Sequence, residues 1–195
     1  WSLAEAPEIP AGVTKCGYMF RDCSAFLKAP EIPVGVTNCD YMFYGCSSLT
    51  SVTIPDSVIR IGKQAFNSCS IRSVYITDLV KWCAISFDDY GSNPFYYCEE
   101  EKESNLYLNG ELIEKLVLPG DVTHIGEYAF SGCSLKSVVI STSVTAIGDS
   151  AFLGCRSLMD IAIADSVTYI GDSAFMNCTS LTNIVIPDSV TSIGD

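Results

Sequence analysis

The sequence is poor in basic residues and in histidine. Its 195 residues include 11 lysines and arginines against 23 aspartates and glutamates, which gives a net charge of −12, and His124 is its one histidine. A chain this acidic lacks the electrostatic footprint of a nucleic-acid-binding protein, and anionic membrane surfaces repel it. A single imidazole leaves little material for histidine-based catalysis, so the composition argues against the common hydrolytic enzymes.

Long apolar runs and metal-binding cysteine motifs are also missing. No stretch approaches the roughly 18 unbroken apolar residues of a membrane-spanning helix. The ten cysteines include no Cys-x-x-Cys pair, which makes a zinc site improbable. There is no nucleophile elbow and no glycine-rich phosphate loop. We therefore predict no catalytic residues, no metal, no cofactor, no nucleic-acid partner and no membrane insertion by this segment.

Phenylalanine and cysteine, in contrast, recur at a fixed spacing. Six phenylalanines, spaced by 23, 23, 64, 22 and 23 residues, are each followed three residues later by cysteine. The pairs are Phe20–Cys23, Phe43–Cys46, Phe66–Cys69, Phe130–Cys133, Phe152–Cys155 and Phe175–Cys178. The gap of 64 indicates that residues 70–129 hold one ordinary unit and one enlarged, irregular unit. Periods of about 20–29 residues with one short strand per unit are typical of leucine-rich solenoids.

Within a unit the apolar residues have the spacing of a strand that ends at a turn. Leu181, Ile184 and Ile186 alternate as in a strand, and residues 187–189 (Pro-Asp-Ser) then break it. Residues 172–175 (Asp-Ser-Ala-Phe) are predicted to form an N-capped single helical turn. Much of the acidic excess then belongs to the repeat itself. Asp56, Asp165 and Asp188 are predicted turn residues, and Asp149, Asp172 and Asp195 are predicted caps.

These residues resemble the BspA-like leucine-rich repeats of bacterial surface proteins. Residues 49–76 and 116–195 follow the pattern Leu-x-x-Val-x-Ile-Pro-x-x-Val-x-x-Ile-Gly-x-x-Ala-Phe-x-x-Cys. Residues 1–48 are similar to a sister variant of this repeat, and residues 77–115 look like the irregular unit that such proteins carry. Within the irregular unit, Asn109-Gly110 between apolar residues predicts a two-residue hairpin turn.

The resemblance implies an open, curved leucine-rich-repeat solenoid, α/β by convention, with short parallel strands on its concave face. We expect one domain over residues 1–195, with about eight units of 22–23 residues and one enlarged unit. Because solenoids need polar capping units, we expect the chain to be part of a longer protein. The resemblance further implies a secreted or cell-surface location and binding to a host extracellular-matrix or other surface protein or glycoprotein.

The cysteines have two interpretations. Ten cysteines in an exported protein are compatible with disulfides, but six occupy the same apolar repeat position, where a buried free thiol acts as a small hydrophobe. We predict free thiols for these six. Cys83 and Cys98 are the pair most suited to a bridge, if one forms.

Aromatic residues gather at residues 75–107. Trp82, Phe87 and Phe95 are predicted to fill the core of the enlarged unit. Tyr90, Tyr96 and Tyr97 form a possible aromatic patch, and the sequence leaves open whether they are core or binding residues.

The concave face supplies the main candidate site. If the aliphatic residues of each strand point inward, the residues between them point outward, and stacking aligns one partly apolar row. The row comprises Thr53, Tyr75, Val117, Val139, Ala162 and Val185. Exposed apolar residues on a sheet have an explanation in β-propensity, but contiguous exposed apolar surface also marks partner sites. The leading hypothesis is a non-catalytic surface binding or adhesion module. The alternative is a structural spacer in a multidomain surface protein.

Overall fold

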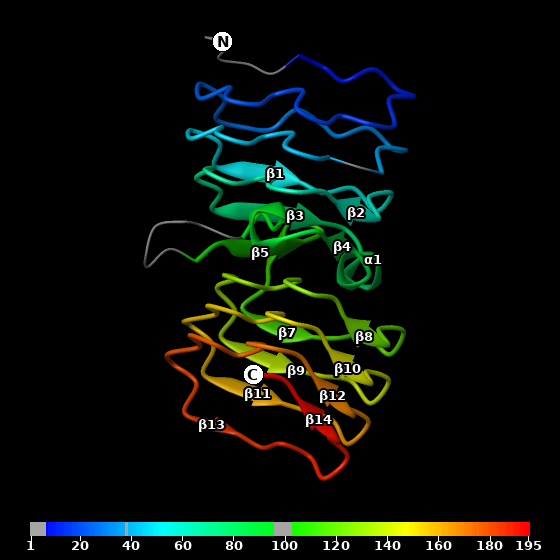
Figure 1. Ribbon diagram of the computed structural model, residues 1–195, viewed down its shortest axis with the longest axis vertical. Helices are drawn as coiled ribbons and strands as arrows, with labels where there is room; N and C mark the ends of the chain where they lie inside the picture. Colours follow the sequence, from blue (N-terminus) through cyan, green and yellow to red (C-terminus); the bar gives the residue numbers. More distant parts are fainter. Residues whose placement is uncertain (1–6, 38, 96–102) are drawn as a thin grey trace.

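The chain winds its units into a column, and from residue 49 onward each unit other than the irregular one forms two short strands (Figure 1). The computed structural model describes residues 7–37, 39–95 and 103–195. In a typical unit, β9 (Ser137–Val139) is followed by a turn at residues 142–143 and then by β10 (Ala146–Ile147). The strands are short because a turn rich in proline, aspartate or serine interrupts each unit. Asp56, Asp165 and Asp188 lie in these turns, as predicted.

Parallel pairing stacks each strand on its counterpart in the next unit. The first ladder consists of β1 (Ser51–Thr53), β3 (Ser73–Ile76) and β5 (Asn105–Leu108), then β7 (Lys115–Val117), β9, β11 (Asp160–Ala162) and β13 (Asn183–Ile184). The second ladder consists of β2 (Arg60–Ile61) and β4 (Ser86–Phe87), then β8 (His124–Ile125), β10, β12 (Tyr169–Ile170) and β14 (Ser192–Ile193). The predicted solenoid with short parallel strands is confirmed. Its division into the predicted subtypes of repeat stays a prediction.

The irregular unit interrupts both ladders. It contains the helix α1 (Leu79–Cys83) and the 3₁₀ helix η1 (Tyr90–Ser92). The chain then folds back from β5 onto β6 (Glu111–Leu112), an antiparallel pair. Asn109 at φ 52° and Gly110 at φ 85° join the two strands, which confirms the predicted hairpin, because two positive φ angles are the signature of a type I′ turn.

Side-chain and backbone hydrogen bonds continue the column across the interruption. The Trp82 indole Nε1 donates to the Ala129 carbonyl over 3.0 Å, and the Gly126 amide donates to the Cys83 carbonyl over 3.0 Å. Trp82 is buried and packs edge-on against the rings of Phe87 and Phe95. The prediction that these three aromatic residues form the core of the enlarged unit is confirmed.

Columns of stacked phenylalanines form the axis of the core in the regular parts. Phe43 lies between Phe20 and Phe66, with ring centroids 5.7 and 5.5 Å away. Phe152 lies between Phe130 and Phe175 at 5.4 and 5.6 Å. The ring planes are within 18° of parallel, and offset stacking of this kind stabilises a core beyond the area that it buries.

The segments that precede these phenylalanines form turns rather than the predicted single helical turns. Ser150 and Ser173 have φ 53°, a left-handed conformation that a right-handed helix excludes. Their amides donate to the next unit instead, Ser150 to the Asp172 carbonyl and Ser173 to the Asp195 carbonyl. Asp149 and Asp172 likewise accept from the backbone amides of Asp172 and Asp195 through their side chains, so they connect units and do not cap a helix.

The repeat cysteines are buried free thiols, as predicted. The thiol of one unit donates to the carbonyl of the phenylalanine in the unit before it. The four bonds are Cys46 to Phe20, Cys69 to Phe43, Cys155 to Phe130 and Cys178 to Phe152, with lengths of 3.0–3.2 Å. Cys83 is a free buried thiol as well, and Cys98 lies outside the described residues.

Truncation of one stacked ring tests the packing. Phe152→Ala should lower the free energy of unfolding by about 3–5 kcal/mol, because the ring is fully buried between two others. Urea unfolding followed by circular dichroism measures the change. Met176→Ala, at a side chain that is 55% exposed, is the control and should change stability by less than about 0.5 kcal/mol. A loss below about 1 kcal/mol for Phe152→Ala would contradict the stacked core.

Burial should also make the thiols inert in the folded protein. It raises the pKa of Cys39, Cys46 and Cys83 to about 12 and that of Cys178 to about 11, so the reactive thiolate is scarce at pH 8. We expect a chromogenic disulfide reagent at pH 8 to titrate at most one of the ten cysteines in the native chain and all ten in denaturant. Rapid reaction of several native thiols would show that the column opens or packs differently.

Candidate functional site

The first ladder presents alternate side chains to the core and to solvent. Val74, Leu106 and Val138 point inward and are fully buried. The outward side chains make up what we call the strand face: Ser51, Thr53, Ser73, Tyr75, Asn105, Tyr107, Lys115, Val117, Ser137, Val139, Asp160, Ala162, Asn183 and, just after β13, Val185. The strands that carry this face, from β1 to β13, lie along one side of the column (Figure 1).

The structure brings the predicted row together in two groups. Thr53 is the strand partner of Tyr75, and Val139 is the partner of both Val117 and Ala162. Val185 follows β13 and is 69% exposed. The β5–β6 hairpin and the absence of pairing between β6 and β7 among the described residues separate the two groups.

Sequence reasoning did not place Tyr107 on this face. Tyr107 is the strand partner of Tyr75, and their rings stack with centroids 4.7 Å apart and planes 23° apart. The alternation Leu106-Tyr107-Leu108 was the signal that could have found it, because Leu106 is fully buried and the residue after it must point outward.

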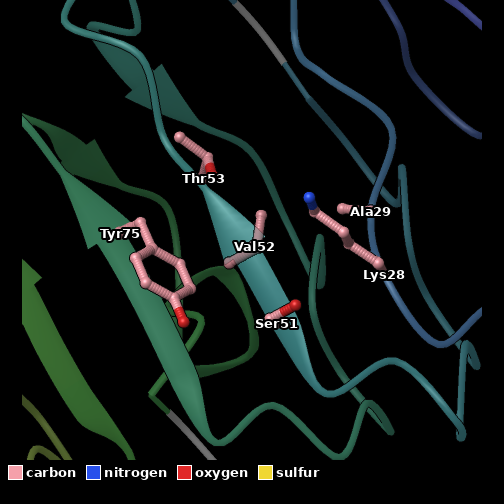
Figure 2. Close-up of a pocket in the computed structure, with 6 residues that line it drawn as sticks. All are labelled: Lys28, Ala29, Ser51, Val52, Thr53 and Tyr75. Atoms are coloured by element: carbon pink, nitrogen blue, oxygen red, sulfur yellow. The ribbon is translucent and has the colours of Figure 1, made fainter. Parts of the chain in front are cut away.

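A hollow of about 360 Å³ lies beside this tyrosine pair (Figure 2). The residues around it are Lys28, Ala29, Ser51, Val52, Thr53 and Tyr75. Tyr75 and Lys28 lie on opposite sides of β1, and residues 51–53 lie between them (Figure 2). The isolated parallel bridge between Lys28 and Ser51 extends the sheet by one residue and fixes the position of Lys28.

The predicted aromatic patch is represented by Tyr90 alone. Tyr90 begins η1 and is 46% exposed, away from the first ladder. Tyr96 and Tyr97 lie outside the described residues.

A different aromatic cluster lies near the N-terminal end of the column. Tyr18 and Tyr41 stack at 4.8 Å, and Tyr44 lies 5.9 Å from Tyr41. The guanidinium of Arg21 lies 5.0 Å from the centre of the Tyr44 ring and about as close to the other two rings, at 5.9 and 6.0 Å. Arg21 already occupies the position that an external cation would take, so the cluster is a self-contained cation–π contact.

Charged groups elsewhere stabilise contacts between units. Arg60 on β2 donates through Nε to Asp88, which follows β4, over 2.8 Å. Asp89 accepts hydrogen bonds from Gln64 and Ser92; burial opposes its ionisation, but these bonds keep the pKa of its carboxyl below the usual value. These pairs connect the regular unit to the irregular one.

The second ladder has the remaining ionisable groups of interest. Asp149 beside the Tyr169 hydroxyl raises the pKa of that phenol, and the two groups share a 3.2 Å hydrogen bond. His124 is exposed, with its Nδ1 3.3 Å from the Thr123 hydroxyl. Within residues 7–37, 39–95 and 103–195, no group of three or more histidine, cysteine, aspartate or glutamate side chains is placed to hold a metal ion. The same residues contain no helix with the length and apolar character needed to cross a bilayer.

Known proteins contain the same kind of repeat. The family model described as a BspA type leucine rich repeat region matches residues 7–102 and 100–195, with six copies. No curated protein sequence matches the chain. A crystal structure of a leucine rich cell surface protein from Faecalibacterium prausnitzii is similar, with 27% identity and a TM-score of 0.53, over 96% of this chain and 61% of that protein.

A second solved structure has the same architecture. The leucine rich repeat protein of T. pallidum matches 91% of this chain and 76% of its own length, with 24% identity and a TM-score of 0.54. The chain thus spans about three fifths of the F. prausnitzii protein and about three quarters of the T. pallidum protein. With the family model covering nearly every residue, the chain belongs to the BspA type leucine-rich repeat family.

Proposed function

We propose that this chain is a non-catalytic binding module that recognises a macromolecular partner through its strand face. The observation that carries the proposal is the exposure of aliphatic side chains on that face: Val117 is 55% exposed and Val185 is 69% exposed. Val139 and Ala162 lie in register with Val117, and Val185 directly follows the next strand, β13. Exposed apolar residues in neighbouring positions lower the cost of desolvation when a partner binds.

The family supports a location and a class of partner. The similar F. prausnitzii protein is described as a cell surface protein, which supports a secreted or surface-exposed location for this chain. We take the partner to be a host extracellular-matrix or other surface protein or glycoprotein. Rigid complementarity suffices for such binding, because the stacked units hold the face in one shape before the partner arrives.

A matched pair of double variants tests the proposal. Val139→Glu with Val185→Glu adds two charges to the strand face, at positions separated by Ala162. His124→Glu with Ser192→Glu adds two charges to the second ladder, at positions separated by two strands. Binding to immobilised fibronectin, fibrinogen and similar matrix glycoproteins would be measured by surface plasmon resonance at physiological salt.

We expect the wild-type chain to bind saturably. The strand-face variant should bind with an affinity lower by about tenfold or more, since burying an unpaired charge costs more than about 1.4 kcal/mol. The second-ladder variant should keep the affinity of the wild type. Equal loss in both variants would indicate a general charge effect and contradict the assigned face. Absence of binding by the folded wild-type chain would instead favour the structural spacer.

A further inference from the structure

The hollow on the strand face has one aromatic wall. Tyr107 covers one side of the Tyr75 ring in a stack of 4.7 Å. Because β3 lies between β1 and β5, Tyr107 contacts the Tyr75 ring from the side away from β1, whereas the hollow lies on the β1 side, beside the short side chain of Thr53. Tyr75 therefore lines the hollow with aromatic surface, and its stack with Tyr107 holds that ring in place.

The floor and the far wall carry polar groups beside the apolar side chains of Val52 and Ala29. Ser51 and Thr53 contribute hydroxyl groups from β1, the strand that runs along the floor (Figure 2). Lys28 forms the wall opposite Tyr75, and Figure 2 shows its side chain on the other side of β1, with the ammonium group directed toward that strand. The volume of about 360 Å³ is at the lower end of the range of roughly 300–1,000 Å³ for small-ligand sites.

The charge of the hollow is the reverse of that of the chain. The lining includes one cation, Lys28, and no carboxylate, although the chain has a net charge of −12. Arg72, which immediately precedes β3, is a second exposed cation beside this part of the sheet. A ligand that fits must therefore combine a negative charge with hydroxyl groups and an apolar face.

We propose that this hollow binds a carboxylated sugar unit of a glycan. The C–H groups on one face of a pyranose ring pack against the negative face of an aromatic ring, which Tyr75 supplies. Its hydroxyls exchange hydrogen bonds with Ser51 and Thr53, and its carboxylate pairs with Lys28. A phosphate group has no apolar face and would make no use of Tyr75. This inference rests on the proposed function and specifies the part of a glycoprotein that the strand face recognises.

Titration of the ¹⁵N-labelled chain with single sugars tests the proposal. The probes are glucuronic acid and N-acetylneuraminic acid, with glucose as the uncharged control, followed by amide chemical shifts at neutral pH. We expect saturable shifts at residues 51–53 and 73–76 with the acidic sugars and much weaker ones with glucose. Lys28→Gln should weaken acidic-sugar binding by about tenfold or more, as loss of a charged hydrogen bond does.

Three further variants separate recognition from folding. Lys63→Gln removes an exposed cation outside both the hollow and the strand face, and should bind the sugars like the wild type. Tyr75→Phe keeps the ring and should retain binding, whereas Tyr75→Ala should lose it. The spectrum of each variant shows whether it is folded.

Absence of shifts with either acidic sugar, or shifts that Lys28→Gln leaves unchanged, would overturn the sugar site. Its failure is distinguishable from that of the proposed function. If a matrix glycoprotein binds equally before and after enzymatic removal of its glycans and still depends on Val139 and Val185, the strand face binds protein and the sugar site is wrong.

Discussion

The structure depends on the repetition of one inward-facing set of side chains at a constant rise along the column. A single unit has too few residues to surround its own phenylalanine, and two neighbours must cover the two faces of the ring. Phe43 and Phe152 show the consequence, because each is fully buried and stacked on both sides. Backbone hydrogen bonds then connect successive units, as the amides of Tyr128, Ser150 and Ser173 show by donating to carbonyls of the following unit.

The same constraint explains the cysteines and the aspartates. At the cysteine position a small side chain is needed that fills space and satisfies a carbonyl of the preceding unit, and the thiol of Cys155 does both. The side chains of Asp149 and Asp172 accept hydrogen bonds from backbone amides of the following unit. The acidity of the chain is thus partly a requirement of its architecture. The hollow beside Lys28 is an exception, because its lining has one cation and no carboxylate while the chain has a net charge of −12.

The repeat, the strands and the buried thiols were predictable because they follow from a regular spacing of residues. The Asn109-Gly110 hairpin was predictable because it follows from local turn chemistry. The turns at Ser150 and Ser173 were not predictable as left-handed, since their conformation follows from hydrogen bonds to a neighbouring unit. Tyr107 was missed for a related reason. Its place beside Tyr75 depends on the register in which the irregular unit pairs with β3, and the regular spacing of the repeat does not predict that register. The cluster of Arg21 with Tyr18, Tyr41 and Tyr44 likewise arises from contacts between units.

We propose that the strand face, and no other side of the column, contacts the partner. Hydroxyl-radical footprinting of the chain, alone and bound to a matrix glycoprotein, tests it directly, because tyrosine oxidation reports the exposure of individual side chains. If the strand face binds the partner, we expect the oxidation of Tyr75 and Tyr107 to fall on binding. The oxidation of Tyr169, on the second ladder, should not change. Protection of Tyr169 with no change at Tyr75 and Tyr107 would contradict it.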